Sequence, residues 1–349
     1  MNVTVHQRPG VYSAYDASSV VSGSGAGKQV GLVAVNAKAA ANEVKIVTSY
    51  DGAVNAFGQG TMAELVRLAL KNGAGAVAAV PIAGGEGYAD GFAALEGLED
   101  ITAVICDSTD GDVQKAMKQS VETASANRRE RIAVAAGGAG ETVDQLIARA
   151  KALNHERVGL VAPGGVNQNG EAADGLGVAA AVAGAIAGES DPAVPLGGAV
   201  LTGLYGLSGR YSDGEMDRLI LGGVTPVESL AGTIGVVRGV TTRTTTGEAA
   251  DATWRDLTTI RIVDDVIPTL RRALRTKFQR AKNTAQSRGA IRAQVVLELE
   301  NKKAREIITG YENVTVTADS QDPARCLVDF SFTVAHGLNQ IWLTAHITV

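Results

Sequence analysis

Short apolar runs alternate with longer amphipathic segments between residues 30 and 163. Six of these runs are continuously apolar and bounded by Gly, Asp or Pro, which is typical of strands buried on both faces. Most successive runs are separated by segments long enough for a helix, and this order predicts crossovers between parallel strands. The predicted strands are 30–35, 44–47, 76–82, 102–106, 132–136 and 158–162.

The intervening segments have the apolar spacing of amphipathic helices. In the first of them, Thr61 is a candidate N-cap with Glu64 three residues later, and Gly73 is a candidate C-terminal stop. Strands that alternate with helices of this length are typical of a mainly parallel sheet covered on both faces. The sequence therefore predicts a central α/β domain. The clearest helices are 61–72, 112–126 and 142–153.

The apolar pattern changes in the rest of the chain. Residues 175–187 predict a small-residue helix, the Thr-rich run 236–246 has β propensity, and residues 254–303 have a helical and basic pattern. From Asn313 onward, apolar and polar residues alternate strictly, as in antiparallel strands with one buried face. We therefore expect an α+β domain after the α/β domain.

Both ends of the chain also alternate in the manner of strands, and we treat them as candidate arms. An unpaired strand with an apolar face is normally paired or covered, so each arm pairs either within its own chain or with a neighbouring subunit. The Gly- and Ser-rich segment 18–28 would give the first arm a flexible stem. The candidate arm residues are Val3, Val5, Val11, Tyr12, Ile341, Trp342, Leu343, Ile347 and Val349.

Length and charge support a division into two domains. The chain has 349 residues, and single cores stop growing at roughly 250–300. Residues 1–235 carry 16 Lys and Arg against 25 Asp and Glu, whereas residues 236–349 carry 16 against 12, which indicates either two surfaces with different partners or a solvated basic face. We predict an arm at 1–22, a linker at 23–29, an outer α/β domain at 30–235 and an inner α+β domain at 236–349, whose last strand begins at about 336.

A basic helix is predicted near Pro268. Asp264 and Asp265 diverge by about 100° on a helix, so they cannot form a paired acid–base site. Acids just before a proline suit a helix N-terminus instead. Beyond them, the apolar stripe is Ile267, Leu270, Leu274 and Phe278, and the cationic flank is Arg271, Arg272, Arg275 and Lys282.

The cationic flank has three possible interpretations. It is a solvated face, a surface that docks onto an acidic protein, or a nucleic-acid site. The last is disfavoured because the only aromatic residue of the segment, Phe278, belongs to the apolar stripe and the whole chain has a net charge of −5.

No motif in the sequence assembles an enzyme site. The segment 22–28 lacks the first Gly and the Ser or Thr of a phosphate loop, and the G-x-G-x-x-A pattern at 175–180 lies too far from the preceding predicted strand for a dinucleotide site. The four histidines are scattered, and two cysteines are too few for a zinc site. We expect no catalysis and no cofactor. The alternative is a soluble α/β nucleotide-binding enzyme with a site near Asp107 and Gly164.

Several segments resemble contractile tail sheath proteins of bacteriophages and phage-tail-like bacteriocins. They occur in the order of that family: the N-terminal Arg8-Pro-Gly-Val-Tyr12, the run 237–244, the segment 254–265 that leads into a helix, the segment 285–291 with Arg288, and the β-rich C-terminus. The chain is short for a sheath protein, so the resemblance implies a compact subunit without large outer decorations.

The resemblance implies a structural subunit of a helical sheath. Such subunits stack in six-subunit rings around an inner tail tube and insert their terminal strands into the sheets of neighbouring subunits. The implied partners are other copies of the chain, the tube protein, the baseplate and the tail terminator, with no nucleic acid and no direct membrane insertion. Assembly would take place in the cytoplasm of a bacterial host, and the product would be a virion or a released tail-like particle. The cationic flank would face the tube.

Overall fold

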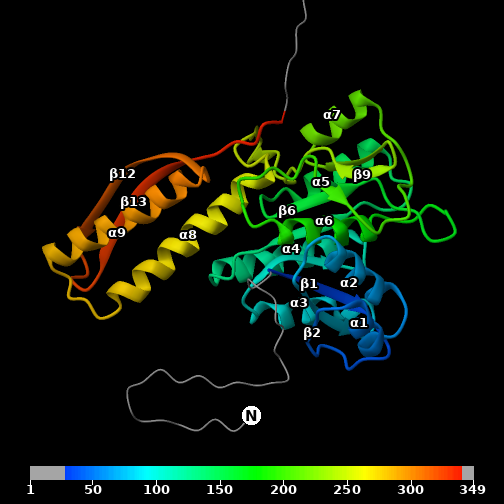
Figure 1. The fold of residues 1–349 in the computed structure, drawn as a ribbon, viewed down its shortest axis with the longest axis horizontal. Helices are drawn as coiled ribbons and strands as arrows, with labels where there is room; N and C mark the ends of the chain where they lie inside the picture. Colours follow the sequence, from blue (N-terminus) through cyan, green and yellow to red (C-terminus); the bar gives the residue numbers. More distant parts are fainter. Residues whose placement is uncertain (1–27, 340–349) are drawn as a thin grey trace, which may run out of the picture.

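The computed structural model describes residues 28–339, and its centre is a nine-stranded sheet (Figure 1). The strand order is β2-β3-β1-β4-β5-β6-β8-β9-β7. The strands from β3 to β8 in this order are parallel, whereas β2, β9 and β7 pair antiparallel at the two edges. The strands are β1 Gln29–Val35, β2 Lys45–Val47, β3 Ala76–Ile82, β4 Ile101–Cys106, β5 Ile132–Ala136, β6 Val158–Ala162, β7 Val200–Leu201, β8 Thr225–Leu230 and β9 Thr233–Val236.

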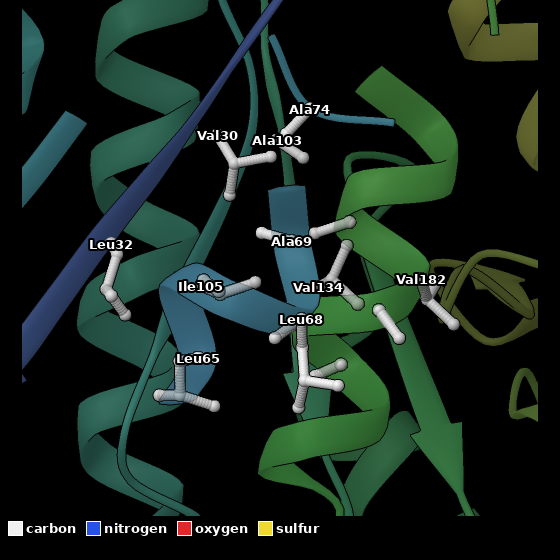
Figure 2. Packing of buried hydrophobic residues seen from close by; sticks show 14 of the residues in the cluster. Val30, Leu32, Leu65, Leu68, Ala69, Ala74, Ala103, Ile105, Val134 and Val182 are labelled. Carbon is white, nitrogen blue, oxygen red and sulfur yellow. The ribbon is translucent and has the colours of Figure 1, made fainter. Parts of the chain in front are cut away.

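Helices cover both faces of this sheet, which confirms the predicted mainly parallel α/β fold. Phe92, Met117 and Leu146 bring α3, α4 and α5 onto one face. Helices α1, α2 and α6 pack on the other face, where Leu68, Ala69 and Val182 meet Val134 of the sheet (Figure 2). The helices are α1 Tyr50–Phe57, α2 Thr61–Lys71, α3 Tyr88–Glu96, α4 Gly111–Ala126, α5 Val143–Leu153, α6 Leu176–Gly188 and α7 Asp213–Leu221, with a 3₁₀ turn at Gly85–Gly87. We call residues 29–236 the α/β unit.

Helix capping follows the sequence in one case and departs from it in another. The Thr142 side chain caps α5 and forms a capping box with Gln145. By contrast, the prediction that Thr61 caps α2 is wrong, because Gly60 occupies the N-cap and Thr61 is already helical. Gly60 adopts a φ of 150°, a conformation that residues with a Cβ rarely adopt.

A second unit consists of two long helices and a β-hairpin, and we call it the α8–hairpin unit. Helix α8 extends away from the α/β unit, α9 packs along α8, and the hairpin packs on α9 (Figure 1). The predicted antiparallel C-terminal strands are confirmed by the pairing of the hairpin strands. The elements are α8 Leu257–Phe278, α9 Ala285–Ala304, β12 Ile308–Ala318 and β13 Cys326–Val334.

Helix α8 begins 11 residues before Pro268, so the predicted helix start beside that proline is wrong. Proline removes one intrahelical hydrogen bond, and tertiary contacts compensate for its loss. Leu257 and Ile260 lie in the core of the α/β unit, whereas Ile262 and Val266 lie in the core of the α8–hairpin unit. One continuous helix is therefore shared by two cores.

Residues 236–256 connect the two units and pack on the α/β unit. The backbone N–H of Thr242 donates to the Val158 carbonyl at 2.8 Å, and the Val240 N–H donates to Thr225 Oγ1 at 2.9 Å. Within the β-prone run 236–246, the strand residues are Val236, at the end of β9, and β10 Thr245–Thr246, which pairs with β11 Ala249–Ala250. Val240 forms an isolated bridge with Asp256. The domain boundary between residues 235 and 236 stays a prediction.

Candidate functional site

A cavity of about 620 Å³ separates the α/β unit from one flank of α8, and we call it the charged cleft. One wall is the loop 127–131 between α4 and β5, and the other is the flank of α8 that carries Arg272 and Arg275. Lys28, just before β1, also lines the cleft. The cleft is therefore built from residues far apart in the sequence.

The four residues of the predicted cationic flank have three different environments. Arg272 and Arg275 are exposed and line the cleft. Arg271 donates from Nη2 to Glu130 Oε1 at 2.8 Å, so its charge is balanced within the chain. Lys282 is not on the helix, because α8 ends at Phe278; the assignment of Lys282 to the helix is wrong, and the residue lies in the connection to α9.

The second half of this cationic surface was not predicted from the sequence. Arg128 and Arg129 line the cleft opposite α8, and neither forms an ion pair with a described residue. Their cluster in the run Asn127-Arg-Arg-Glu130 was visible in the sequence. What the sequence lacked was any sign that this loop faces α8.

Two buried arginines add positive charge behind the surface of the cleft. Arg131 is 1% exposed and donates to the carbonyls of Leu95 and Leu98 at 2.8 and 2.6 Å. Arg261 is 7% exposed and donates to the Glu189 and Val194 carbonyls. Burial lowers the pKa of both, that of Arg131 to about 10. Neither guanidinium has a carboxylate as a hydrogen-bond acceptor among residues 28–339, so the cleft keeps a cationic excess.

An ion pair at Asp264, which also lines the cleft, joins α8 to the α/β unit. Arg157 donates from Nη1 and Nη2 to the two carboxylate oxygens of Asp264 at 2.7 and 2.9 Å. Burial raises the pKa of Asp264, and the Arg157 guanidinium opposes this shift. Asp265 pairs with Lys302 of α9 instead. The two aspartates thus serve different contacts, in agreement with the prediction that they form no paired acid–base site.

The two-stranded sheet of the hairpin is incompletely covered. Neither β12 nor β13 has a second partner strand among the described residues. The rings of Phe330 and Phe332 lie with their centroids 6.2 Å apart and pack against the core of the α8–hairpin unit, yet both side chains are only half-buried. A cavity of about 410 Å³ beside this sheet is lined by Leu274, Phe278 and Lys282 among others. The sheet therefore has free edges and spare apolar surface.

All the predicted arm residues, from Val3 to Tyr12 and from Ile341 to Val349, lie outside residues 28–339. The described residues nearest to the two arms lie beside the α/β unit. Lys28 lines the charged cleft, and a Cβ on Gly337 would lie 2.7 Å from Cβ of Pro195.

Asp107 and Gly164, the residues of the alternative enzyme site, make contacts within the fold. Asp107 accepts hydrogen bonds from the Val35 backbone N–H at 2.9 Å and from the Tyr88 hydroxyl at 2.6 Å. Burial and the Asp107 carboxylate together raise the Tyr88 pKa. A Cβ at Gly164 would lie 2.2 Å from the Ala173 carbonyl oxygen, so this glycine permits a close backbone approach. These contacts support a structural role for both residues.

Among residues 28–339, no group of three His, Cys, Asp or Glu residues could hold a metal ion. No helix of these residues has the length and apolar character needed to cross a membrane.

Two protein-family models match successive parts of the chain, beginning at residue 82. The model of the phage tail sheath protein central domain matches residues 82–242, and that of the phage tail sheath C-terminal domain matches residues 249–348. A comparison with curated proteins gives no match.

Solved structures share the fold at low sequence identity. The sheath tail protein of Desulfitobacterium hafniense superposes with a TM-score of 0.70 at 13% identity, over 93% of this chain and 100% of that one. The contracted helical sheath of the anti-feeding prophage gives 0.72 at 17%, over 98% and 99%. The contracted PVC sheath complex of an extracellular contractile injection system gives 0.71 at 18%, over 99% of each chain.

Proposed function

Because the chain belongs to the phage tail sheath family, as a structural sheath subunit of a contractile tail or injection system, we propose that it polymerises helically around an inner tube. Contraction of this polymer drives the tube through the envelope of a target cell. The observation that carries the proposal is the β12–β13 sheet, which leaves both edges without a partner strand among residues 28–339. Free edges with apolar surface are normally covered, and a neighbouring subunit can supply the cover.

The arms are the strands that would complete this sheet. Val3 and Val5 in one arm, and Ile341 and Leu343 in the other, alternate with other residues, as a strand that packs one face on a half-covered sheet requires. Backbone hydrogen bonds along β12 or β13 would provide strength, and pockets for alternate side chains would set the register. Pairing of this kind would bury Phe330 and Phe332 more completely.

The other partners follow from the family. Copies of the chain would form six-subunit rings, and the ends of the sheath would contact the baseplate and the tail terminator. Assembly takes place in the cytoplasm of a bacterial host, and the particle is a virion or a released phage-tail-like structure.

The cationic flank of α8 is proposed to dock onto an acidic tube. Arg272 and Arg275 are its exposed members on the helix, and Lys282 extends it into the connection to α9. Arg271 contributes less, because Glu130 already holds it. Reversing Arg272 and Arg275 to glutamate should prevent assembly of the extended sheath on purified tube. Normal assembly of this variant would show that the tube does not bind this surface.

Contraction is proposed to be a rigid-body rearrangement. Since α8 is shared by two cores, one subunit can move as a single body while the segments 18–28 and 337–340 act as hinges. New contacts between subunits in the contracted lattice supply the work, and no nucleotide hydrolysis is needed.

The proposal is tested by changing one face of the first arm. The double substitution Val3→Asp and Val5→Asp places charges on the face that packs on a neighbour, whereas Thr4→Asp and His6→Asp places them on the opposite face. Negative-stain electron microscopy and sedimentation across a concentration series should show tubes or ring stacks for the wild type and the control pair. The valine pair should remain a folded monomer with unchanged circular dichroism. Efficient polymerisation of that variant would disprove the exchange of arms.

A further inference from the structure

The parallel sheet gathers exposed acidic residues at one of its edges. Strands β3, β1, β4, β5 and β6 run in the same direction, so the loops that follow them meet at their carboxyl ends. Helix α7 joins this edge, because Arg218 pairs with Asp144 in the first turn of α5. We call six exposed residues here the acidic edge: Glu86, Asp90, Asp110, Glu171, Asp213 and Asp217. None of the six forms an ion pair with a described residue.

The opposite edge of the same sheet contains the charged cleft. Lys28 precedes β1, and Arg128 and Arg129 precede β5, so all three lie where parallel strands begin. Arg272 and Arg275 of α8 face the same cavity. Figure 1 shows α7 at the top of the α/β unit, whereas α8 extends from its left side. The chain therefore carries two surfaces of opposite charge at different ends.

Helix dipoles explain why the charges divide in this way, but they leave those charges free to act between molecules. Acids stabilise the helix N-termini at one edge, and bases stabilise the helix C-termini at the other. Asp110 is engaged in this manner as the N-cap of α4. Asp213 and Asp217 lie one turn apart on α7 and stay exposed, while the capping box of that helix uses Ser212 and Glu215.

We propose that the acidic edge of one subunit docks into the charged cleft of the next copy of the chain. The two surfaces differ and lie at different ends, so the contact is heterologous and repeats head to tail, as a helical polymer requires. Buried Arg131 and Arg261 strengthen the cleft, because each brings positive charge without a carboxylate acceptor in the described part of the chain. This inference rests on the proposed polymer. It uses the wall of the cleft that carries Lys28, Arg128 and Arg129, which is separate from the arms and from Arg272 and Arg275, the residues that face the tube in the proposed function.

A second copy suits the cleft better than a nucleic acid does. Glu99, Asp100 and Glu130 line the same cavity as the arginines. A phosphate polymer of uniform charge would be repelled by these carboxylates, whereas a protein surface places a few carboxylates at fixed points. Every subunit also supplies both surfaces in equal number, which no other partner does.

The test uses two full-length variants with opposite changes. The cleft variant carries Arg128→Glu and Arg129→Glu, and the edge variant carries Asp213→Lys and Asp217→Lys. Each should polymerise at least tenfold less than the wild type in a sedimentation assay at about 0.1 M salt, where charges act over about 10 Å. An equimolar mixture of the two should recover polymer, because each then meets a surface of opposite sign. The matched control Lys303→Glu with Arg305→Glu changes the net charge equally at exposed positions outside the cleft.

Direct binding separates this inference from the proposed function. Surface plasmon resonance of the cleft variant against the edge variant should show association that is lost at 0.5 M salt, a condition that screens exposed charges. If the variants neither bind each other nor lose polymer, while the wild type polymerises, the docking inference is wrong and the sheath function stands. If the wild type forms no polymer but the variants associate, the sheath function fails and the docking stands. Equal loss of polymer in the control variant, or no recovery in the mixture, would also overturn the docking.

Discussion

The α/β unit and the α8–hairpin unit bury their apolar residues to very different extents. The two clusters on the faces of the nine-stranded sheet contain 35 and 23 buried residues, whereas the α8–hairpin cluster contains eight. The parallel strands β3, β5 and β6 are buried along their whole length, but the inward-facing residues of β13 are only half-buried. The α/β unit buries its sheet with helices of its own chain. In the α8–hairpin unit, the described residues leave the hairpin sheet only partly covered.

The largest predicted effect compares one phenylalanine from each unit. Phe92 in the α/β unit is 1% exposed. Replacing it with alanine should lower the free energy of unfolding by about 3–5 kcal/mol, because the substitution leaves a cavity in a fully packed site. Phe330→Ala in the half-covered sheet should cost less than about 1.5 kcal/mol in the monomer, since its side chain is partly hydrated already. Urea unfolding of both variants measures the difference, and equal losses would contradict the contrast between the units.

Polymer formation by Phe330→Ala gives a second measure of the contrast between the units. Phe330→Ala should reduce polymer formation more than its effect on the monomer predicts, because arm pairing would bury this face further. The measurement is the concentration at which half of the protein sediments. A shift no larger than that of an exposed control, Leu297→Ala on α9, would show that the sheet is already complete in the single subunit.

A smaller effect is expected at the joint between the two units. Arg157→Met removes the counter-charge of Asp264 and should cost about 2–3 kcal/mol at pH 7, because a partly buried carboxylate is left unpaired. Burial raises the folded-state pKa of Asp264, so the unpaired carboxylate binds a proton more readily in the folded state than in the unfolded state. The loss should therefore shrink as the pH falls toward 4. Combining the change with Asp264→Asn should restore most of the stability in calorimetry, and no recovery would argue against the ion pair.

The smallest effect concerns Asp251 in the connection between the units. Hydrogen bonds from the Thr246 hydroxyl and the Thr253 backbone N–H lower the pKa of Asp251 to about 2. A lowered pKa contributes stability above the ordinary Asp value of 3.8, and this contribution is lost as the pH falls through about 2. Asp251→Asn should therefore be less stable than the wild type at pH 6, and this difference should shrink as the pH falls through about 2. A stability difference that does not change with pH would show that titration of Asp251 does not cause it.

Sequence patterns predicted the α/β unit well because its signals are local. Continuous apolar runs such as 76–82 and 158–162 became strands within a residue of the predicted limits. The helix start at Pro268 failed because a local rule was overridden by packing: Leu257 and Ile260 hold the preceding turns of α8 in the core of the α/β unit. The hairpin was predictable because alternation is likewise local.

The candidate site was predicted only in part. Arg272 and Arg275 followed from helical spacing, but Arg271 was assigned to the free surface although Glu130 holds it. That pair joins residues 141 positions apart, and no periodicity encodes the direction in which α8 leaves the α/β unit. For the same reason, the sequence did not predict that Arg128 and Arg129 face α8. The arm residues remain predictions, since they lie outside residues 28–339.

The shared helix also sets how displacement passes through the subunit. With 22 residues at about 1.5 Å each, α8 is a lever about 33 Å long whose fulcrum is its buried first turns. A tilt of about 10° at Leu257 would carry the far end at Phe278 through about 6 Å, by the same geometry. By this geometry, a small rotation of the α/β unit would become a larger displacement at the far end of α8, and a force applied there would act as a torque on the α/β unit.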